Sequence, residues 1–312
     1  MTPEKDNSEL TFPQFDVVLD MSDHHFLGPD PLPRMEKRFL KAISKEWRIL
    51  QENLPESIFV RVSETRSDLL RAAIIGIAGT PYHDALFFFD IGLPPSYPNE
   101  PPKVHYLSRG YCVNPNLKRN GAVCLSLLNT FYGSRSERWN PEMSTLLQVL
   151  LSIQSLVLNE EPYFNIPYNF VNWKRLSDSF SQNFFLHTCM TTVHLIRNPP
   201  SKFEPLITHH FRQRANAILA ACDAYANGRV MLGFHGCDGA APPRFKIPRR
   251  FQRDMERVYA HLVIEFRRIE AHVPPSGERL VVQPSKKPKG IFRRMIKNIR
   301  DALGLKKKNS DK

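Results

Sequence analysis

One cysteine of the chain, Cys124, lies in a sequence that gives its thiol a chemical role. It ends the run Asn114-Pro115-Asn116-Leu117-Lys118-Arg119-Asn120-Gly121-Ala122-Val123-Cys124, which is rich in polar and turn-forming residues. A cysteine thiolate suits covalent catalysis because sulfur is nucleophilic and leaves readily. We therefore interpret Cys124 as a nucleophile.

The other cysteines have simpler interpretations. Cys189 and Cys222 lie on helical apolar patterns, and Cys112 precedes Cys124 by twelve residues, so we expect these three to be small buried apolar residues. Five cysteines at irregular spacing, Cys237 included, do not form a disulfide framework. This usage favours a reducing compartment, the cytoplasm or the nucleus.

Apolar spacing predicts the elements that must position Cys124. Helical spacing runs over residues 34–50 and returns over residues 142–158. Between them, turn signals separate four short strands, at residues 58–62, 69–77, 86–91 and 104–106. We expect an α+β core in which the strands form an antiparallel meander and Cys124 follows the last strand in an irregular segment.

Helical patterns continue beyond this core. They cover residues 173–197, 203–225 and 249–271, and a Gly- and Pro-rich segment, 233–243, separates the last two. The predicted organisation is an extended leader, a core, a helical C-terminal extension and a basic amphipathic tail, at residues 1–30, 31–172, 173–275 and 276–312.

Six motifs of the core occur in a recognisable order. They are Gly79-Thr80-Pro81-Tyr82, the strand at residues 86–91, Tyr97-Pro98, Pro101-Pro102-Lys103-Val104, Asn116 eight residues before Cys124, and Trp139-Asn140-Pro141. A lone Tyr-Pro or Pro-Pro would carry no information, but the set in this order is specific. Over residues 33–165 the chain resembles the catalytic core of a ubiquitin-conjugating enzyme.

The resemblance implies transfer of a small protein modifier. The carboxyl terminus of ubiquitin would arrive as a thioester on an activating enzyme, pass to Cys124, and then be taken by a lysine amine. ATP is consumed by the activating enzyme, so the chain is expected to need no cofactor of its own. The implied partners are ubiquitin, the activating enzyme, protein substrates and a ubiquitin ligase.

Asn116 aligns with an asparagine of the family that stabilises the oxyanion formed when lysine attacks, or orders the loop around the site. A neutral donor aimed at developing charge supplies about 3 kcal/mol. The family's usual His-Pro-Asn is here Asn114-Pro115-Asn116. We expect the change at Asn114 to alter the hydrogen bonds of the loop without abolishing the chemistry.

The triplet Asn-Pro-Asn resembles that of a subset of the family, the large conjugating enzymes that also act as their own ligases. Residues 130–138 lengthen a loop that is short in minimal members. In the leader, Phe15-Asp16-Val17-Val18 and Ser22-Asp23-His24-His25-Phe26 resemble plant conjugating enzymes of the phosphate-homeostasis type.

The run Asn159-Glu160-Glu161-Pro162-Tyr163-Phe164-Asn165 resembles the gate that large members place opposite the cysteine. Minimal members often have an Asp there to deprotonate or orient the lysine, whereas Phe164 or Asn165 aligns at that position here. Asn165 could orient a lysine but cannot take its proton. Glu160 and Glu161 are alternatives, although adjacent acids in a loop are usually solvated. The base stays unassigned.

The first helix is the docking surface for the activating enzyme in the family. Arg38, Lys41 and Lys45 could make that contact, and a solvated helix face is the alternative. Two interpretations of the extension are equally supported. It contacts substrate, ligase or ubiquitin, or it serves as a scaffold.

The charge of +12 is concentrated in the tail. Residues 281–312 hold eleven Lys or Arg and two Asp, which leaves +3 for the rest, so we expect no specific nucleic-acid partner. Over residues 286–308 apolar and basic residues interleave, a pattern typical of a helix on an anionic membrane or in an acidic groove. Residues 286–289 could instead be a nuclear import signal.

Other site and targeting patterns are weak. The pairs His24-His25 and His209-His210, and His235-Gly236-Cys237, lack the second cluster that a structural zinc needs, so no metal is expected. We also expect no signal peptide and no spanning helix. Localisation is predicted to be cytoplasmic, nuclear or both, with peripheral membrane association through the tail.

Three functional hypotheses follow. The leading one is an active conjugating enzyme, with ligase activity of its own as in the large subset. A catalytically weak adaptor that binds ubiquitin or a ligase and is tethered by its tail is the second, and retention of Cys124 argues against it. In the third, the modifier is a ubiquitin relative such as the small ubiquitin-like modifier.

Overall fold

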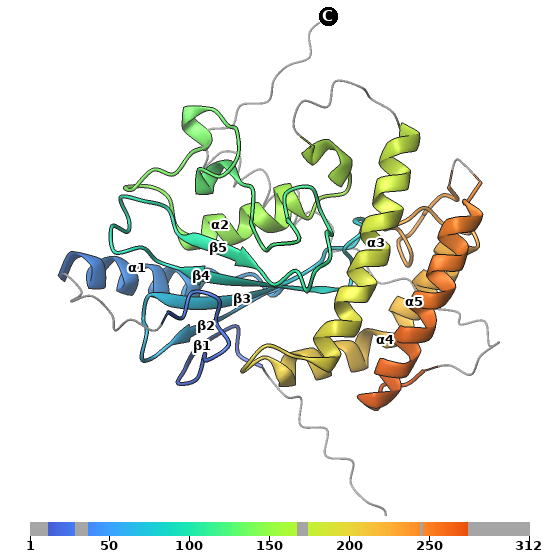
Figure 1. Cartoon of the computed structure of the whole chain (residues 1–312), viewed down its shortest axis with the longest axis horizontal. Helices are drawn as coiled ribbons and strands as arrows, with labels where there is room; N and C mark the ends of the chain where they lie inside the picture. Colours follow the sequence, from blue (N-terminus) through green and yellow to red (C-terminus); the bar gives the residue numbers. More distant parts are fainter. Residues whose placement is uncertain (1–11, 29–36, 167–173, 244–245, 274–312) are drawn as a thin grey trace, which may run out of the picture.

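The computed structural model describes residues 12–28, 37–166, 174–243 and 246–273, and its centre is a five-stranded sheet with helices on both faces (Figure 1). The predicted antiparallel meander is present as β2 (Ile58–Ser63), β3 (Leu69–Ile75), β4 (Leu86–Gly92) and β5 (Lys103–Tyr106). The α+β fold class predicted from the sequence is confirmed.

The two faces of the sheet belong to two different apolar clusters. Side chains alternate along a strand, so Phe87 and Phe89 of β4 lie in the cluster with the helices of the core. Phe88, between them, lies in the cluster with the helices of the extension. Every residue of β4 is buried, which explains why its sequence is apolar except for Asp90.

The leader contributes a strand that the sequence analysis did not predict. β1 (Phe15–Val18) pairs in parallel with β2, from Phe15 opposite Val60 to Val18 opposite Ser63. Beyond this strand the described part of the leader is not extended, because the His24 N–H donates to the Met21 carbonyl and the Leu27 N–H to the His24 carbonyl in turns. A four-residue segment with two half-buried and two exposed side chains has too little alternation to be recognised alone.

Two helices cover the core face of the sheet. α1 (Lys37–Asn53) buries Phe39, Ile43 and Leu50. The helix predicted at residues 142–158 starts later, as α2 (Leu146–Ser152), and continues as a π-helical segment, η3 (Ile153–Val157). The start is set by Thr145, whose hydroxyl accepts from the Gln148 N–H in a capping box.

The three helices predicted for the extension are confirmed as α3 (Lys174–Arg197), α4 (Glu204–Ala226) and α5 (Arg249–Arg268). They pack together on the sheet face that carries Phe88.

Polar contacts of Asp84, in the β3–β4 turn, also join the extension to the core. The Asp84 carboxylate pairs with Arg214 and accepts from His83 Nδ1 at 2.8 Å. The Asp84 carbonyl accepts from His210 Nε2 at 2.8 Å. His83 Nε2 in turn accepts from the Tyr225 hydroxyl at 2.8 Å. These bonds join the extension to the core.

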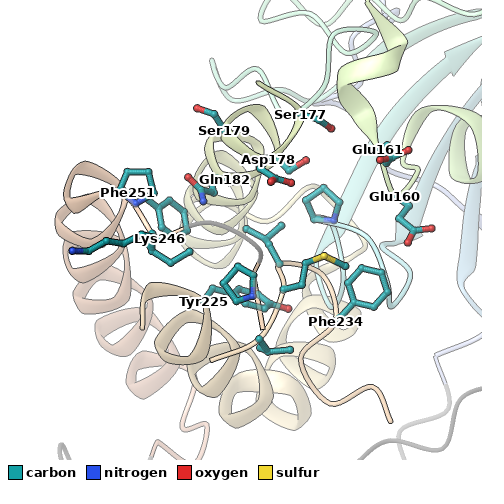
Figure 2. A pocket seen from close by; sticks show the side chains of 18 residues that line it. Glu160, Glu161, Ser177, Asp178, Ser179, Gln182, Tyr225, Phe234, Lys246 and Phe251 are labelled. Carbon is teal, nitrogen blue, oxygen red and sulfur yellow. The ribbon is translucent and has the colours of Figure 1, made fainter. Parts of the chain in front are cut away.

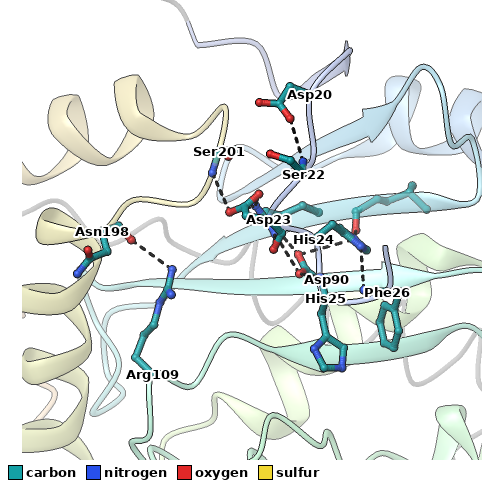
Figure 3. A network of polar contacts seen from close by, with 12 residues as sticks. Asp20, Ser22, Asp23, His24, His25, Phe26, Asp90, Arg109, Asn198 and Ser201 are labelled. Carbon is teal, nitrogen blue, oxygen red and sulfur yellow. Dashed lines mark hydrogen bonds and ion pairs between the residues drawn. The ribbon is translucent and has the colours of Figure 1, made fainter. Parts of the chain in front are cut away.

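The leader is held on the sheet around a buried arginine, and Figure 3 shows Asp23 and His25 of the leader beside Asp90 and Ser201. Arg71 of β3 pairs with Asp90 of β4 at 2.5 Å and with Asp23 of the leader at 2.7 Å. The His25 N–H donates to Asp90 at 2.8 Å, and the Ser201 N–H, between α3 and α4, donates to Asp23 at 3.2 Å. One charge network thus connects leader, sheet and extension.

Two further observations concern the described ranges alone. None of the helices there is long and apolar enough to cross a membrane, and none of the His, Cys, Asp and Glu side chains described forms a group of three placed to hold a metal ion. The tail at 276–312, with its amphipathic segment 286–308, lies outside the described residues.

Candidate active site

Asn116 and Cys124 face each other across a small hairpin. Leu117 pairs with Val123, and the Lys118 N–H donates to the Ala122 carbonyl at 2.9 Å. At the open end of this hairpin the Cys124 N–H donates to the Asn116 carbonyl at 2.8 Å. The eight-residue spacing seen in the sequence is therefore the length of chain that returns Cys124 to the side of Asn116.

The turn of the hairpin requires a glycine. Gly121 has a φ of +85°, a conformation that side-chain-bearing residues rarely adopt. A Cβ on Gly121 would also lie 2.0 Å from the ring of His105 on β5. The Gly121 carbonyl accepts from the Tyr106 N–H at 2.8 Å, which holds the hairpin against the sheet.

Asn114 anchors the start of this loop and is fully buried. Its Nδ2 donates to the Val157 carbonyl at 2.7 Å and to the Tyr82 hydroxyl at 2.8 Å. Its Oδ1 accepts from the Asn116 N–H at 2.8 Å. Burial raises the pKa of Tyr82, so this hydroxyl stays protonated and donates onward to the Val113 carbonyl. The side chain that replaces the family's histidine thus holds the loop.

Asn165 lies at the end of the short 3-10 helix η4 (Pro162–Asn165) and turns toward the same anchor. Its Nδ2 donates to the Val157 carbonyl at 3.0 Å and to Asn114 Oδ1 at 3.3 Å, and its Oδ1 accepts from Asn159 Nδ2 at 2.9 Å. Both ends of the Asn165 amide are therefore engaged in holding gate and loop together. Phe164, the other candidate at this position, is 43% exposed.

Thr130 is a positioning residue that the sequence analysis placed only within a lengthened loop. Its hydroxyl donates to the Val123 carbonyl at 2.7 Å and accepts from the Leu125 N–H at 3.0 Å. It therefore fixes the backbone on both sides of Cys124. Because this hydroxyl bonds only to backbone groups, which any residue supplies, no partner residue type could be recognised in the sequence. The one available indication was that Thr130 lies six residues after the nucleophile.

The rest of the lengthened loop is held by local contacts. Ser134 and Glu137 form a capping box around the 3-10 helix η2 (Arg135–Glu137), and the Ser126 hydroxyl of η1 (Ser126–Leu128) donates to the Tyr132 carbonyl at 3.0 Å. Behind this loop, the Trp139 indole donates to the Pro98 carbonyl at 2.7 Å.

The cysteines differ in exposure. Cys124 is half-buried. Cys189 and Cys222 are buried, as predicted. The prediction that Cys112 is buried is wrong: it is half-buried, with its sulfur 3.5 Å from the Asn114 carbonyl.

The acids Glu160 and Glu161 are both exposed, just before η4. They line a cavity beside the extension, and neither Cys124 nor Asn116 is part of its lining. The structure thus brings Asn114, Asn116, Cys124 and Asn165 into one constellation and leaves the two glutamates at its margin.

Arg38, Lys41 and Lys45 lie together on the exposed side of α1. With Arg48 and Pro98 they line a shallow groove of about 620 Å³. The opposite side of α1 is fixed by Glu46, which accepts from the Tyr97 hydroxyl at 2.7 Å and from the Leu146 N–H at 2.9 Å. Burial raises the pKa of Glu46. These contacts hold α1 against the core and leave its basic side chains on the exposed side.

Residues 42–188 match the family model described as ubiquitin-conjugating enzyme. A solved ubiquitin-conjugating enzyme E2 from Plasmodium falciparum is 26% identical and covers 37% of this chain and 94% of its own, with a TM-score of 0.32.

Curated relatives extend the similarity beyond the core. The Arabidopsis thaliana probable ubiquitin-conjugating enzyme E2 24 is 51% identical over 72% of this chain, which spans only 26% of that relative. The putative ubiquitin-conjugating enzyme E2 38 of the same plant is 44% identical over 82% of this chain and 81% of its own length. The human dual E2 ubiquitin-conjugating enzyme/E3 ubiquitin-protein ligase BIRC6 is 38% identical over 59% of this chain and 4% of its own length. The chain belongs to the ubiquitin-conjugating enzyme family.

Proposed function

We propose that the chain accepts ubiquitin from an activating enzyme as a thioester on Cys124 and transfers it to lysine side chains. The observation that carries the proposal is the 2.8 Å hydrogen bond from the Cys124 N–H to the Asn116 carbonyl, which holds the backbone of the half-buried Cys124 beside that of Asn116. Membership of the family supports the same assignment.

In the first step the Cys124 thiolate attacks the carbonyl of ubiquitin's terminal thioester, and the thiolate of the activating enzyme leaves. In the second step a neutral lysine amine attacks the new thioester. The Asn116 amide stabilises the oxyanion of that intermediate, which collapses to an isopeptide as the Cys124 thiolate leaves. The amine proton passes to solvent in this proposal, because the Asn165 amide cannot take it and Glu161 lines a cavity whose lining includes neither Cys124 nor Asn116.

The partners of these steps are ubiquitin, the activating enzyme and an acceptor protein. ATP is consumed by the activating enzyme, so this chain uses no cofactor. The basic side chains of α1, Arg38, Lys41 and Lys45, are proposed to meet an acidic surface of the activating enzyme. Ligase activity of its own is a further proposal, prompted by the human relative, which is named a dual conjugating enzyme and ligase.

The test is a charging assay with ubiquitin, ATP and an activating enzyme, resolved on non-reducing gels. We expect a thiol-sensitive adduct of one ubiquitin on the wild type and on Cys112→Ala, and none on Cys124→Ala. Cys112 is the matched control because it is also half-buried. Charging of the Cys124→Ala protein would remove the site assignment.

The same assay separates the other hypotheses. Folded protein that takes no ubiquitin while another conjugating enzyme charges in parallel would favour the adaptor. A parallel reaction with the activating enzyme of the small ubiquitin-like modifier identifies the modifier. Omission of any ligase from a reaction with free acceptor protein tests whether the chain acts on its own.

Association with an anionic membrane through residues 286–308 is proposed from the sequence alone, together with a cytoplasmic or nuclear location. Co-sedimentation with vesicles of neutral lipid, with and without acidic lipid, tests the membrane part. Binding that ignores acidic lipid, or that survives deletion of residues 286–312, would remove it.

A further inference from the structure

A cavity of about 570 Å³ lies where the core, α3 and the segment between α4 and α5 meet (Figure 2). Pro81 and the pair Glu160 and Glu161 line it from the core, and residues 177–179, 181 and 182 line it from α3. The remaining wall comes from the segment that follows α4 and from the start of α5, where Phe251 is buried.

The floor of the cavity is apolar. It is formed by Tyr225 and by Val230, Leu232, Phe234 and Phe251, with Met231 beside them. Met231 keeps 37% of its surface exposed, so an apolar side chain stands open to solvent at this place. A concave apolar surface that solvent reaches is a common form of binding site.

Acidic side chains dominate the charge around this floor. Glu160, Glu161 and Asp178 line the cavity, and among the residues that the structure describes there Lys246 is the one cation. In Figure 2 the two glutamates approach from the core side and Asp178 from α3. A ligand that buries an apolar group here and carries positive charge beside it would therefore meet a complementary field.

The cavity is connected to the cysteine loop through the gate. Glu161 directly precedes Pro162, the first residue of η4, and η4 ends at Asn165. Asn165 Nδ2 donates to Asn114 Oδ1, and Asn114 holds the loop of Asn116 and Cys124. A ligand in the cavity therefore contacts the segment that borders the site of transfer.

We propose that this cavity binds a segment of the acceptor protein in which an apolar side chain stands next to lysine or arginine. The inference rests on the proposed function, since it names what the transfer reaction would act on. The apolar side chain fills the floor above Leu232 and Phe251, and the neighbouring cation faces Glu161 and Asp178.

The test measures binding directly, by fluorescence anisotropy of the full chain with a labelled peptide that contains Leu-Lys-Lys between Gly-Ser flanks. Two other peptides replace Leu by Ser, or both Lys by Glu. We expect saturable binding of the first peptide, at least about tenfold weaker binding of the other two, and a loss of affinity as salt is raised.

One pair of variants carries the decision. Met231→Lys puts a cation over the apolar floor and is expected to weaken binding of the Leu-Lys-Lys peptide at least about tenfold. Ile264→Lys is the matched control, because Ile264 is 58% exposed on α5, outside the cavity, and the change in charge is the same. Both variants are expected to charge with ubiquitin and to discharge to free lysine as the wild type does.

Discharge to free lysine separates this inference from the proposed function. If charging or discharge to free lysine fails in the wild type, the proposed function fails, and peptide binding is still measured without it. Equal binding to Met231→Lys, equal binding of the Leu-to-Ser peptide, or a wild-type Kd above about 1 mM overturns the inference. Binding that appears only after removal of residues 276–312 also overturns it, since the tail would then be the occupant.

Discussion

The side-chain amides of Asn114 and Asn165 both donate to the carbonyl oxygen of Val157, at 2.7 and 3.0 Å. This carbonyl belongs to the last residue of η3, where the helix after the cysteine loop ends. The start of the cysteine loop and the end of the gate are therefore fixed to one point of the backbone. A change at either asparagine should move the other.

This arrangement predicts the result of replacing Asn165 by the acid that minimal members of the family carry. In Asn165→Asp a carboxylate oxygen meets the Val157 carbonyl and Asn114 Oδ1, two acceptors, in place of a donor. We expect the free energy of unfolding to fall by about 1–3 kcal/mol. We also expect no gain in transfer to free lysine, because the side chain serves the loop.

Urea unfolding and single-turnover discharge of the charged protein measure the two effects. Glu161→Asp, a change at the exposed acid before η4, is the control for disturbance of the gate in general. Faster transfer by Asn165→Asp at unchanged stability would show that this position orients the lysine after all.

Thr130 predicts an effect on charging from a residue that is not itself a nucleophile. Thr130→Val keeps the shape but removes the hydroxyl that bonds to Val123 and Leu125. Two backbone groups lose their partner, so unfolding should become easier by about 1–3 kcal/mol. The Cys124 backbone is then less well fixed, and we expect charging to slow at least about tenfold.

Thr130→Ser is the matched control, because it retains the hydroxyl and loses a methyl group. Charging rates of the two variants, measured below saturation with activating enzyme, give the comparison. If Thr130→Ser slows charging as much as Thr130→Val, the hydroxyl is not the cause.

Asn116 should act after charging. Its carbonyl already accepts from Cys124, and this backbone bond survives truncation of the side chain. For Asn116→Ala we therefore expect normal thioester formation and transfer to lysine slowed roughly 100-fold, the effect typical of losing one oxyanion donor. Rates of charging and of discharge are measured separately, with Asn227→Ala, an exposed asparagine after α4, as the control. Equal loss in both steps would mean that Asn116 only holds the loop.

Much of the fold could be predicted because the elements bury whole apolar faces. β4 is recognisable from its unbroken apolar run, and α1 from the recurrence of Phe39, Ile43 and Leu50. β1 could not be predicted, because its pairing with β2 depends on a partner more than forty residues away. The sequence holds no local signal for a contact of that range.

The site shows the same division. The spacing of Asn116 and Cys124 was informative because a hairpin of fixed length connects them. Thr130 and Asn165 were harder to interpret, since their partners include main-chain groups that any residue supplies. For Asn165 the sequence suggested contact with a lysine, whereas the structure shows its amide bonded within the protein.

The histidines of the leader and sheet predict a loss of stability in mild acid. Burial lowers the pKa of His24, although the carboxylate of Asp90 opposes this effect. Burial likewise lowers the pKa of His105. His24 is neutral in the fold, because its Nε2 donates to the Leu70 carbonyl at 2.8 Å while its Nδ1 accepts from the Phe26 N–H at 3.2 Å.

The sign follows from these lowered values. Below a pH of about 6.5 these histidines are protonated in the unfolded chain but still neutral in the folded chain. Their contribution to the free energy of unfolding is therefore fully present above that pH and decreases as the pH falls. Each such histidine contributes up to about 1.4 kcal/mol per pH unit until its folded-state pKa is reached. A second loss, from Asp23, begins only below a pH of about 4, because the Arg71 charge lowers the pKa of that carboxyl against the effect of burial.

Urea unfolding at pH 7.5, 6.5, 5.5 and 4.5 therefore isolates the histidines. His24→Gln keeps a donor for the Leu70 carbonyl but does not titrate, so we expect a shallower fall of the free energy of unfolding between pH 6.5 and 4.5. His261→Gln, at an exposed position of α5, should leave the slope as in the wild type. A slope that His24→Gln does not change would contradict this prediction. It would mean that solvent already reaches the His24 ring in the folded chain, so that burial does not lower its pKa.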